Sequence, residues 1–289
     1  MRPAILGLCL LGALAAAGPA GAWGDLGHEV SALIAYDHLT PAARTRVDAL
    51  LAADRDTLTG SGFADRATWA DRYQDRNSDT AAWHFSSIEL DNPKLADACF
   101  GFKKLASGQA ASAGPSQDCT VDKIDQFTAE LRDPATPGPE RILALKYLVH
   151  FTADLTQPLH ASDDHDRGGA CIGIEPPAGH ATNLHAYWDT GVLEAFGTDA
   201  PAIAARLERD ITPAKARAWS AGEPSDWAMD TYAVARRVAY QIPSLPNCED
   251  HATIALSPAY RAEAQRATVV QLEKAGIRIA AELNQALGR

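Results

Sequence analysis

Signals that start helices recur along this chain, whereas the alternating apolar and polar residues of a half-buried strand are almost absent. An N-cap residue followed by proline, which favours the first turn of a helix, occurs at Thr40-Pro41 and at Ser257-Pro258. Apolar residues at helical spacing predict further helices over residues 121–131, 139–155, 184–196 and 226–240, and a last helix over 258–287. The 289 residues therefore predict one compact, all-α domain with many helices.

The first 22 residues have the features of a secretory signal peptide. Arg2 supplies a positive start, residues 4–17 form an apolar run, and Ala20-Gly21-Ala22 provides the small residues that signal peptidase requires. The run is too short to span a bilayer, and Leu8 is too bulky for a lipoprotein signal at Cys9. We therefore predict a signal peptide over 1–22, a mature domain over 23–289, no membrane anchor, and a periplasmic or secreted protein.

Four cysteines remain after the signal peptide, and in an exported chain such a set most often forms two disulfides. Three pairings are possible. Cys99–Cys119 with Cys171–Cys248 is favoured because the first bond closes a short loop. No CxxC spacing occurs, which argues against a metal site built from these cysteines.

The formal net charge of −11 excludes a protein that binds nucleic acid through a broad basic surface. It does not exclude an enzyme whose active site takes its positive charge from metal ions, because a bound ion can determine the local electrostatic potential.

Two histidine–aspartate pairs lie in otherwise apolar or aromatic helical stretches. His150 precedes Asp154, and His185 precedes Asp189, by one helical turn, so each pair lies on one helix face. Either pair alone is typical of a surface ion pair. Two such pairs in apolar surroundings need a reason for burial, and imidazole and carboxylate are good zinc ligands. His160 follows the first pair.

Further metal candidates come from the first third of the chain. Asp71 follows Trp69 in a helical stretch, and His84 lies between two aromatic residues. Cleavage before Trp23 would leave a free amine, with a pKa of roughly 7.7–8.0, five residues before His28. The alternatives are a buried tryptophan plug and ordinary core histidines. These residues together offer enough ligands for three metal ions, whereas His38, His165, His180 and His251 lie in polar segments and are expected to face solvent.

At this point the chain resembles the zinc-dependent single-strand nucleases of fungi, plants and bacteria (the S-one/P-one type). The resemblance covers most of the mature chain. It rests on the segments Trp23-Gly24 to His28, Trp69-Ala70-Asp71, Trp83-His84-Phe85, His150 with Asp154, Thr156 to His160, Gly168-Gly169, and Asn183-Leu184-His185 to Trp188-Asp189. It implies an all-α fold and three zinc ions.

The resemblance also implies a role for each matching residue. Asp71, His84, His150 and Asp154 would hold one zinc ion, the amine and carbonyl of Trp23 with His28 and a shared Asp154 a second, and His160, His185 and Asp189 a third. Asp71 and Asp154 would be the catalytic carboxylates of the bridged pair. Two such ions, roughly 3.5–4 Å apart, activate a water that attacks phosphorus.

The implied activity is hydrolysis of single-stranded DNA and RNA to 5′-phosphate products, together with a 3′-nucleotidase activity on mononucleotides. Phe85 would stack an unpaired base, and Gly168, Gly169 and Asn183 would also contact substrate. A monomer is expected.

Three residues depart from the pattern of the family, and all lie at substrate contacts. Ala170 replaces an asparagine, Gln74 replaces a basic residue, and Ser87 replaces an acidic residue. Arg72 and Arg76 are the candidates to substitute for the basic residue. Two alternatives therefore stay open. One is a zinc-dependent phospholipase C or phosphomonoesterase on the same scaffold, and the other is a periplasmic zinc-binding protein without turnover.

Overall fold

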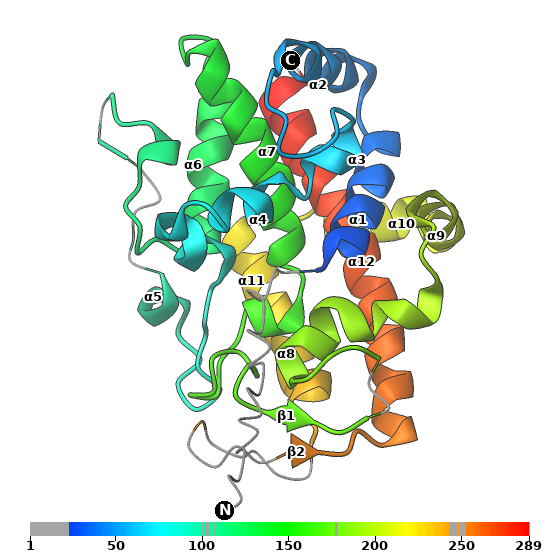
Figure 1. Cartoon of the computed structure of the whole chain (residues 1–289). Helices are drawn as coiled ribbons and strands as arrows, with labels where there is room; N and C mark the ends of the chain where they lie inside the picture. The colour runs from blue at the N-terminus through cyan, green and yellow to red at the C-terminus, as the bar shows by residue number, and fades with distance from the viewer. Residues whose placement is uncertain are drawn as a thin grey trace, which may run out of the picture.

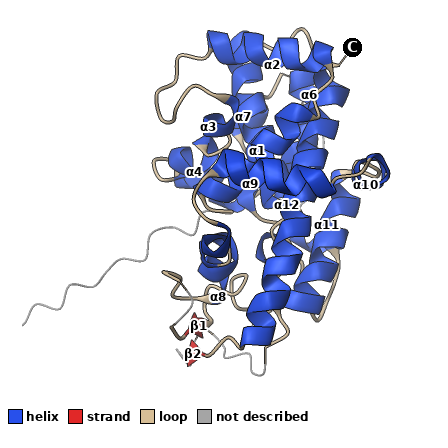
Figure 2. Ribbon diagram, turned by 90° about the vertical axis from the view of Figure 1, so that its right-hand side faces the viewer, coloured by secondary structure: helices blue, strands red, loops and turns tan. Residues whose placement is uncertain are grey.

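The computed structural model describes residues 23–99, 101, 105–106, 108–176, 179–242, 248 and 253–288. The predicted signal peptide and His251 lie outside these residues. The described chain forms one helical body (Figure 1). Its one sheet pairs β1 (Gly173–Ile174) with β2 (Thr253–Ile254) in parallel, and it lies at the end of the molecule that also holds α8 (Leu184–Ala186) (Figure 2).

Four long helices form the centre of the body. α7 (Gly138–Asp154) packs between α6 (Thr120–Arg132) and α12 (Pro258–Leu287), and α12 also packs against α1 (Asp25–Asp37). Every residue of α7 from position 144 to 154 is buried. A helix that is buried on all faces has no solvent-exposed stripe, so polar side chains on its last turns must find partners inside the protein.

Shorter elements surround this centre. The remaining α-helices are α2 (Pro41–Ala53), α3 (Phe63–Arg66), α4 (Trp69–Gln74), α5 (Leu95–Ala98), α9 (Ala200–Leu207), α10 (Pro213–Trp219) and α11 (Pro224–Val234). The 3₁₀ segments are Ser78–His84, Ala111–Ala113, Pro158–His160, Leu193–Phe196 and Glu208–Asp210, and the π-helical turns are Tyr187–Gly191 and Ala235–Ala239.

The prediction of a single all-α domain is confirmed, and so are its clearest helix starts. The side chain of Thr40 accepts a hydrogen bond from the backbone of Ala43, and that of Ser257 accepts one from Tyr260. Each satisfies a backbone donor that the first turn of a helix leaves free.

Two predicted helices differ from those in the structure. The segment 184–196 is α8 followed by a π turn and a 3₁₀ turn, because the backbone of Val192 donates to Tyr187, five residues earlier. The segment 226–240 begins at Pro224, where the carboxylate of Asp226 accepts from the backbone of Glu223, and its α-helix ends at Val234 before a second π turn. Wide turns of this kind often occur at functional sites.

Both favoured disulfides are present. Cys99 is bonded to Cys119 across 20 residues, and Cys171 to Cys248 across 77 residues. The second bond joins the segment before β1 to the segment before β2. None of the described helices is both long and apolar enough to cross a bilayer.

The difference in loop length predicts different effects of the two disulfides on stability. Replacing Cys171 and Cys248 by serine should lower the free energy of unfolding by about 4 kcal/mol, because the bond restricts a long loop in the unfolded chain. Replacing Cys99 and Cys119 should cost about 3 kcal/mol. Urea unfolding of both variants measures the difference, and equal costs would contradict this account.

Candidate metal centre

Eight side chains of the predicted metal set face the interior of the helical body. His150 and Asp154 lie on the buried end of α7, and His28 lies on the first turns of α1. The other five are Asp71 on α4, His84 at the end of a 3₁₀ segment, His160 at the end of another, His185 on α8 and Asp189 in the π turn. The side chain of Asp71 is the most exposed, at 14%, and the others are at most 3% exposed.

Asp71, His84, His150 and Asp154 form one group. Oδ2 of Asp154 lies 2.9 Å from Nδ1 of His84 and 3.3 Å from Nε2 of His150. Oδ1 of Asp71 lies 3.6 Å and 3.3 Å from the same two nitrogens. Two carboxylates and two imidazoles therefore direct one donor atom each toward a common point.

The second oxygen of Asp154 faces another histidine. Oδ1 lies 3.3 Å from Nε2 of His28, whose ring stacks on that of His150 with 4.0 Å between centroids. Asp154 thus presents Oδ2 to His84 and His150 in the first group and Oδ1 to His28 in a second group.

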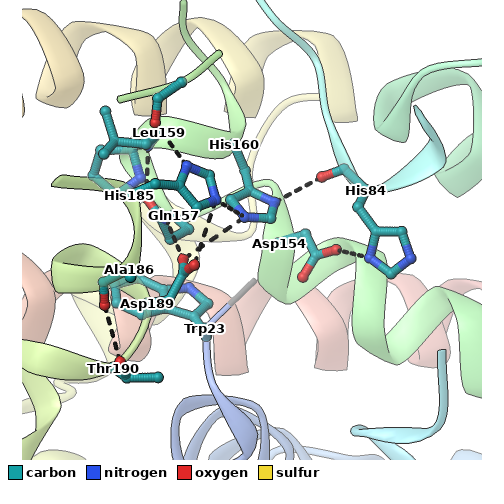
Figure 3. Close-up of polar contacts among 12 residues, drawn as sticks. Trp23, His84, Asp154, Gln157, Leu159, His160, His185, Ala186, Asp189 and Thr190 are labelled. Atoms are coloured by element: carbon teal, nitrogen blue, oxygen red, sulfur yellow. Dashed lines mark hydrogen bonds and ion pairs between the residues drawn. The ribbon is translucent and has the colours of Figure 1, made fainter. Parts of the chain in front are cut away.

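His160, His185 and Asp189 form the third group (Figure 3). Nε2 of His185 lies 3.2 Å from Nε2 of His160 and 3.4 Å from Oδ2 of Asp189. Nε2 of His160 lies 3.7 Å from Oδ1 of Asp189. The π turn places Asp189 toward these two rings, on the same side of the chain as His185 one turn earlier.

Backbone carbonyls fix the orientation of three of the histidine rings. Nδ1 of His150 donates to Ala67 at 2.6 Å, Nδ1 of His160 to His84 at 2.8 Å, and Nδ1 of His185 to Gly168 at 2.6 Å. Each bond requires the proton on Nδ1 and turns Nε2 toward the neighbouring carboxylate and imidazole atoms, the arrangement usual for metal-binding histidines.

The donor atoms fit a cation rather than hydrogen bonds among themselves. Nε2 of His28, Oδ1 of Asp71, Oδ1 of Asp154 and Oδ2 of Asp189 are buried without a hydrogen-bond partner. Two imidazole lone pairs only 3.2 Å apart, at His160 and His185, repel each other unless a positive charge lies between them. Nitrogen and carboxylate donors of this kind suit zinc.

The pKa values follow from burial and from the neighbouring charges. Burial, assisted by His150, lowers the pKa of His28 to about 3, and burial lowers that of His160 to about 3, so both rings are neutral at pH 7. Burial raises the pKa of Asp189 well above its usual value. Burial, the largest single influence, acts in the same direction on Asp154, but the charges of His150 and His84 and the hydrogen bonds from both rings together outweigh it and hold the pKa of Asp154 well below its usual range.

Trp23, the predicted amine ligand, begins the described chain. Its indole is fully buried and donates to Thr156 at 3.2 Å. The backbone of the next residue, Gly24, donates to the carbonyl of Asp189 at 2.9 Å. A Cβ on Gly24 would lie 2.5 Å from the side chain of Thr190, so the close approach of the N-terminal segment to the third group requires glycine there. The ligand role of the amine stays a prediction.

The predicted substrate residues border the third group. The ring of Phe85 stacks on His160, with 4.3 Å between centroids and 25° between planes. Gly168 and Gly169 both have positive φ, and a Cβ on Gly168 would lie 2.6 Å from the carbonyl of Leu159. The side chain of Asn183 caps α8 by accepting from Ala186 at 2.8 Å. Their substrate contacts stay predictions.

The other histidines of the described chain belong to none of the three groups. His38, which was predicted to face solvent, is half-buried. His165 is 67% exposed beside Glu89 and Asp91, and His180 is 98% exposed beside Glu194, as predicted for solvent-facing residues. Arg72, one of the two residues suggested as a substitute for the missing basic residue at Gln74, forms an ion pair with Asp25.

Sequence reasoning gave no role to Gln157. This side chain is fully buried, and its Nε2 donates to Oδ1 of Asp189 at 2.6 Å. Only its place directly before Pro158, between two predicted ligands, pointed toward the site.

Taken together, buried imidazoles and carboxylates with unpartnered donor atoms define a helical metalloprotein. The comparisons with known proteins agree with this class. Residues 23–288 match the S1/P1 Nuclease family. The chain belongs to this family, which makes it a nuclease.

Three relatives show the extent of the similarity. Nuclease PA3 of a Penicillium species is 28% identical over 290 aligned positions, which cover 92% of this chain and 98% of that protein. Nuclease S1 of Aspergillus oryzae is 29% identical over 211 residues, 69% of this chain and 68% of the relative. Endonuclease 2 of Arabidopsis thaliana is 28% identical over 183 residues, 61% and 58% of the two chains.

The two-sided position of Asp154 gives a sharp prediction. Asp154→Asn should weaken metal binding at two positions, each by more than the roughly 10- to 100-fold lost when only a hydrogen-bond partner of a metal ligand is removed, because the side chain loses the charge that both groups share. Asp118→Asn is the matched control, because Asp118 is equally buried but pairs with Lys123. Zinc content after dialysis, measured by elemental analysis, checks the result. Loss of a single ion from Asp154→Asn would disprove the shared role.

Proposed function

We propose that this protein is a trinuclear zinc nuclease that hydrolyses single-stranded DNA and RNA to 5′-phosphate products, with 3′-nucleotidase activity on mononucleotides. The observation that carries the proposal is the position of Asp154, whose two oxygens face His84 and His150 on one side and His28 on the other. The third group, at His160, His185 and Asp189, is the feature that extends a two-metal site to three.

The proposed ligands divide as the geometry groups them. Asp71, His84, His150 and Asp154 would hold the first ion; the amine and carbonyl of Trp23, with His28 and the shared Asp154, the second; and His160, His185 and Asp189 the third. Bound zinc lowers the pKa of water toward neutrality and stabilises negative charge on phosphate oxygens. Because the bound zinc ions would supply the activated water, no protein side chain is needed as a nucleophile.

The protein itself contributes orientation and a dry environment. Backbone carbonyls hold the rings of His150, His160 and His185, and the apolar core around α7 excludes solvent from their far sides. Asp71, the most exposed ligand, marks the side on which solvent reaches the first group. Preorganised donors of this kind need little rearrangement during the reaction.

The position of Phe85 supports a preference for unpaired bases. Its half-buried ring has one face against His160, so a nucleobase would have to stack on the opposite face. A base in a duplex is already stacked on both sides, whereas a base in a single strand can use an aromatic platform without that loss. Stacking is indifferent to the sugar, which is consistent with action on both DNA and RNA.

The two disulfides support an oxidising compartment, so we propose that the protein is periplasmic or secreted. We also propose that it acts as a monomer. The alternative activities on this scaffold, phospholipase C and phosphomonoesterase, differ in substrate and not in metal chemistry. They are therefore outcomes of the same experiment.

The deciding experiment measures nucleotide release from single-stranded DNA by protein that begins at Trp23, with and without a zinc chelator. We expect 5′-mononucleotides, release that stops with the chelator, and recovery when zinc is restored. The same chain with one added residue before Trp23 tests the amine ligand and should hold one zinc ion fewer. Three bound zinc ions without release would refute the nucleic-acid substrate, and phosphatidylcholine and phosphomonoesters would then identify the alternative.

Replacing Phe85 by alanine should separate base binding from metal binding. Loss of the stacking platform should raise KM for single-stranded DNA by about 5- to 100-fold, because stacking contributes about 1–3 kcal/mol per base. Zinc content should stay unchanged. Steady-state kinetics on a single-stranded oligonucleotide measure the effect, and an unchanged KM would remove the stacking role.

A further inference from the structure

We propose that Gln157 is a positioning residue that occupies one oxygen of Asp189 and so reserves the other for the third metal ion. The inference rests on the proposed function, because it concerns the site formed by His160, His185 and Asp189. It adds a residue that determines how many positions on that ion remain for substrate.

The backbone of Gln157 is fixed by the ligands on either side of it. Its N–H donates to the carbonyl of Asp154 at 2.8 Å, and its own carbonyl accepts from the backbone of His160 at 3.0 Å. The side chain starts between two metal groups and has no exposed surface. A change in the orientation of this side chain would therefore also move the residues of the third group.

The orientation of the amide follows from a second hydrogen bond. Oε1 of Gln157 accepts from the backbone N–H of Leu159 at 2.6 Å, which only an oxygen can do (Figure 3). The NH₂ group must then be on the other side, where Nε2 donates to Oδ1 of Asp189 at 2.6 Å. The backbone at Leu159 thus decides that a donor, and not an acceptor, faces Asp189.

This contact makes the two oxygens of Asp189 unequal. Oδ1 accepts from Gln157, whereas Oδ2 has no hydrogen-bond partner and lies 3.4 Å from Nε2 of His185. If Asp189 bound the third ion through Oδ2 alone, His160, His185 and Asp189 would contribute three donor atoms in total. If Asp189 used both oxygens, it would fill a further position, and open positions are what distinguish a catalytic zinc site from a structural one.

A neutral amide suits this task better than a charged side chain. It donates without adding a positive charge that would compete with the metal ion for Asp189. It also satisfies a carboxylate oxygen that would otherwise be buried without a partner. Partners of metal ligands in this position typically change metal affinity 10- to 100-fold when removed.

The test replaces Gln157 by methionine, which keeps the length and volume of the side chain and removes the donor. We expect two of the three zinc ions to bind as in the wild type and the third to bind about 10- to 100-fold more weakly. Titration of the zinc-free full-length mature protein with zinc, against a chromophoric chelator, resolves the three affinities. Zinc alone is the probe, so the result does not depend on activity.

The chain contains a matched control. Gln126 is buried, and its Nε2 donates to Oδ2 of Asp118 at the same 2.6 Å, but Asp118 lies outside the three groups. Gln126→Met removes an equivalent glutamine–aspartate hydrogen bond, together with an acceptor for Lys123, and should not weaken the third ion relative to the other two. A second background, Asp189→Ala, tests the route of action: adding Gln157→Met there should weaken zinc binding no further.

Gln157→Glu covers the case in which the methionine variant does not fold. Glutamate keeps the acceptor for Leu159 and loses the donor, so at pH 8 it should also weaken the third ion. Wild-type affinities for all three ions in both Gln157 variants would overturn the inference and leave the proposed function intact. Equal weakening of all three ions would also overturn it, because the role would then be structural. A wild-type protein that binds fewer than three zinc ions would overturn the proposed metal centre and this inference with it.

Discussion

The arrangement on which the rest of the structure depends is a fully buried carboxylate, Asp154, that faces imidazoles on both sides. A carboxylate without water is costly unless positive charge or hydrogen bonds compensate it. The three surrounding histidines cannot all supply that charge, because burial keeps the ring of His28 neutral. Nε2 of His28 and the Oδ1 atoms of Asp71 and Asp154 are left without a hydrogen-bond partner, so α1, α4 and α7 bring together donor atoms that suit a cation.

Two buried lysines support the walls of this site through aromatic rings. Nζ of Lys146 lies 3.8 Å above the ring of Trp69, two residues before Asp71, and Nζ of Lys123 lies 3.9 Å above that of Trp83, directly before His84. Each lysine also has a carboxylate partner, at 3.4 Å in Asp54 and at 3.6 Å in Asp118. Cation–π contacts and ion pairs are strongest when they are shielded from water. The segments that carry Asp71 and His84 are thus anchored by their tryptophans, although neither segment is a long helix.

The features that were predictable from the sequence are those that depend on local spacing. The pairs His150–Asp154 and His185–Asp189 are one turn apart in any helix, and the N-caps at Thr40 and Ser257 need only their neighbours. The grouping of the ligands was supplied by the family resemblance, because residues 28, 84 and 154 meet only through tertiary packing. The π turn that carries Asp189 was missed because its first residues have an ordinary helical pattern. Gln157 was missed because a single buried glutamine has no periodicity that distinguishes it from a surface residue.

The acidic composition of the chain is compatible with a phosphate-binding site if the positive charge of that site comes from bound metal ions. A protein with a net charge of −11 repels a polyanionic substrate at long range. In the proposed centre, however, three divalent ions carry twice the charge of Asp71, Asp154 and Asp189, so the local potential is positive where phosphate must bind. Charge concentrated in so small a volume would select one phosphate at a time rather than a long stretch of backbone. Such a site suits an enzyme that acts on flexible single strands and on mononucleotides alike, because neither offers the regular phosphate array that a basic surface is built to read.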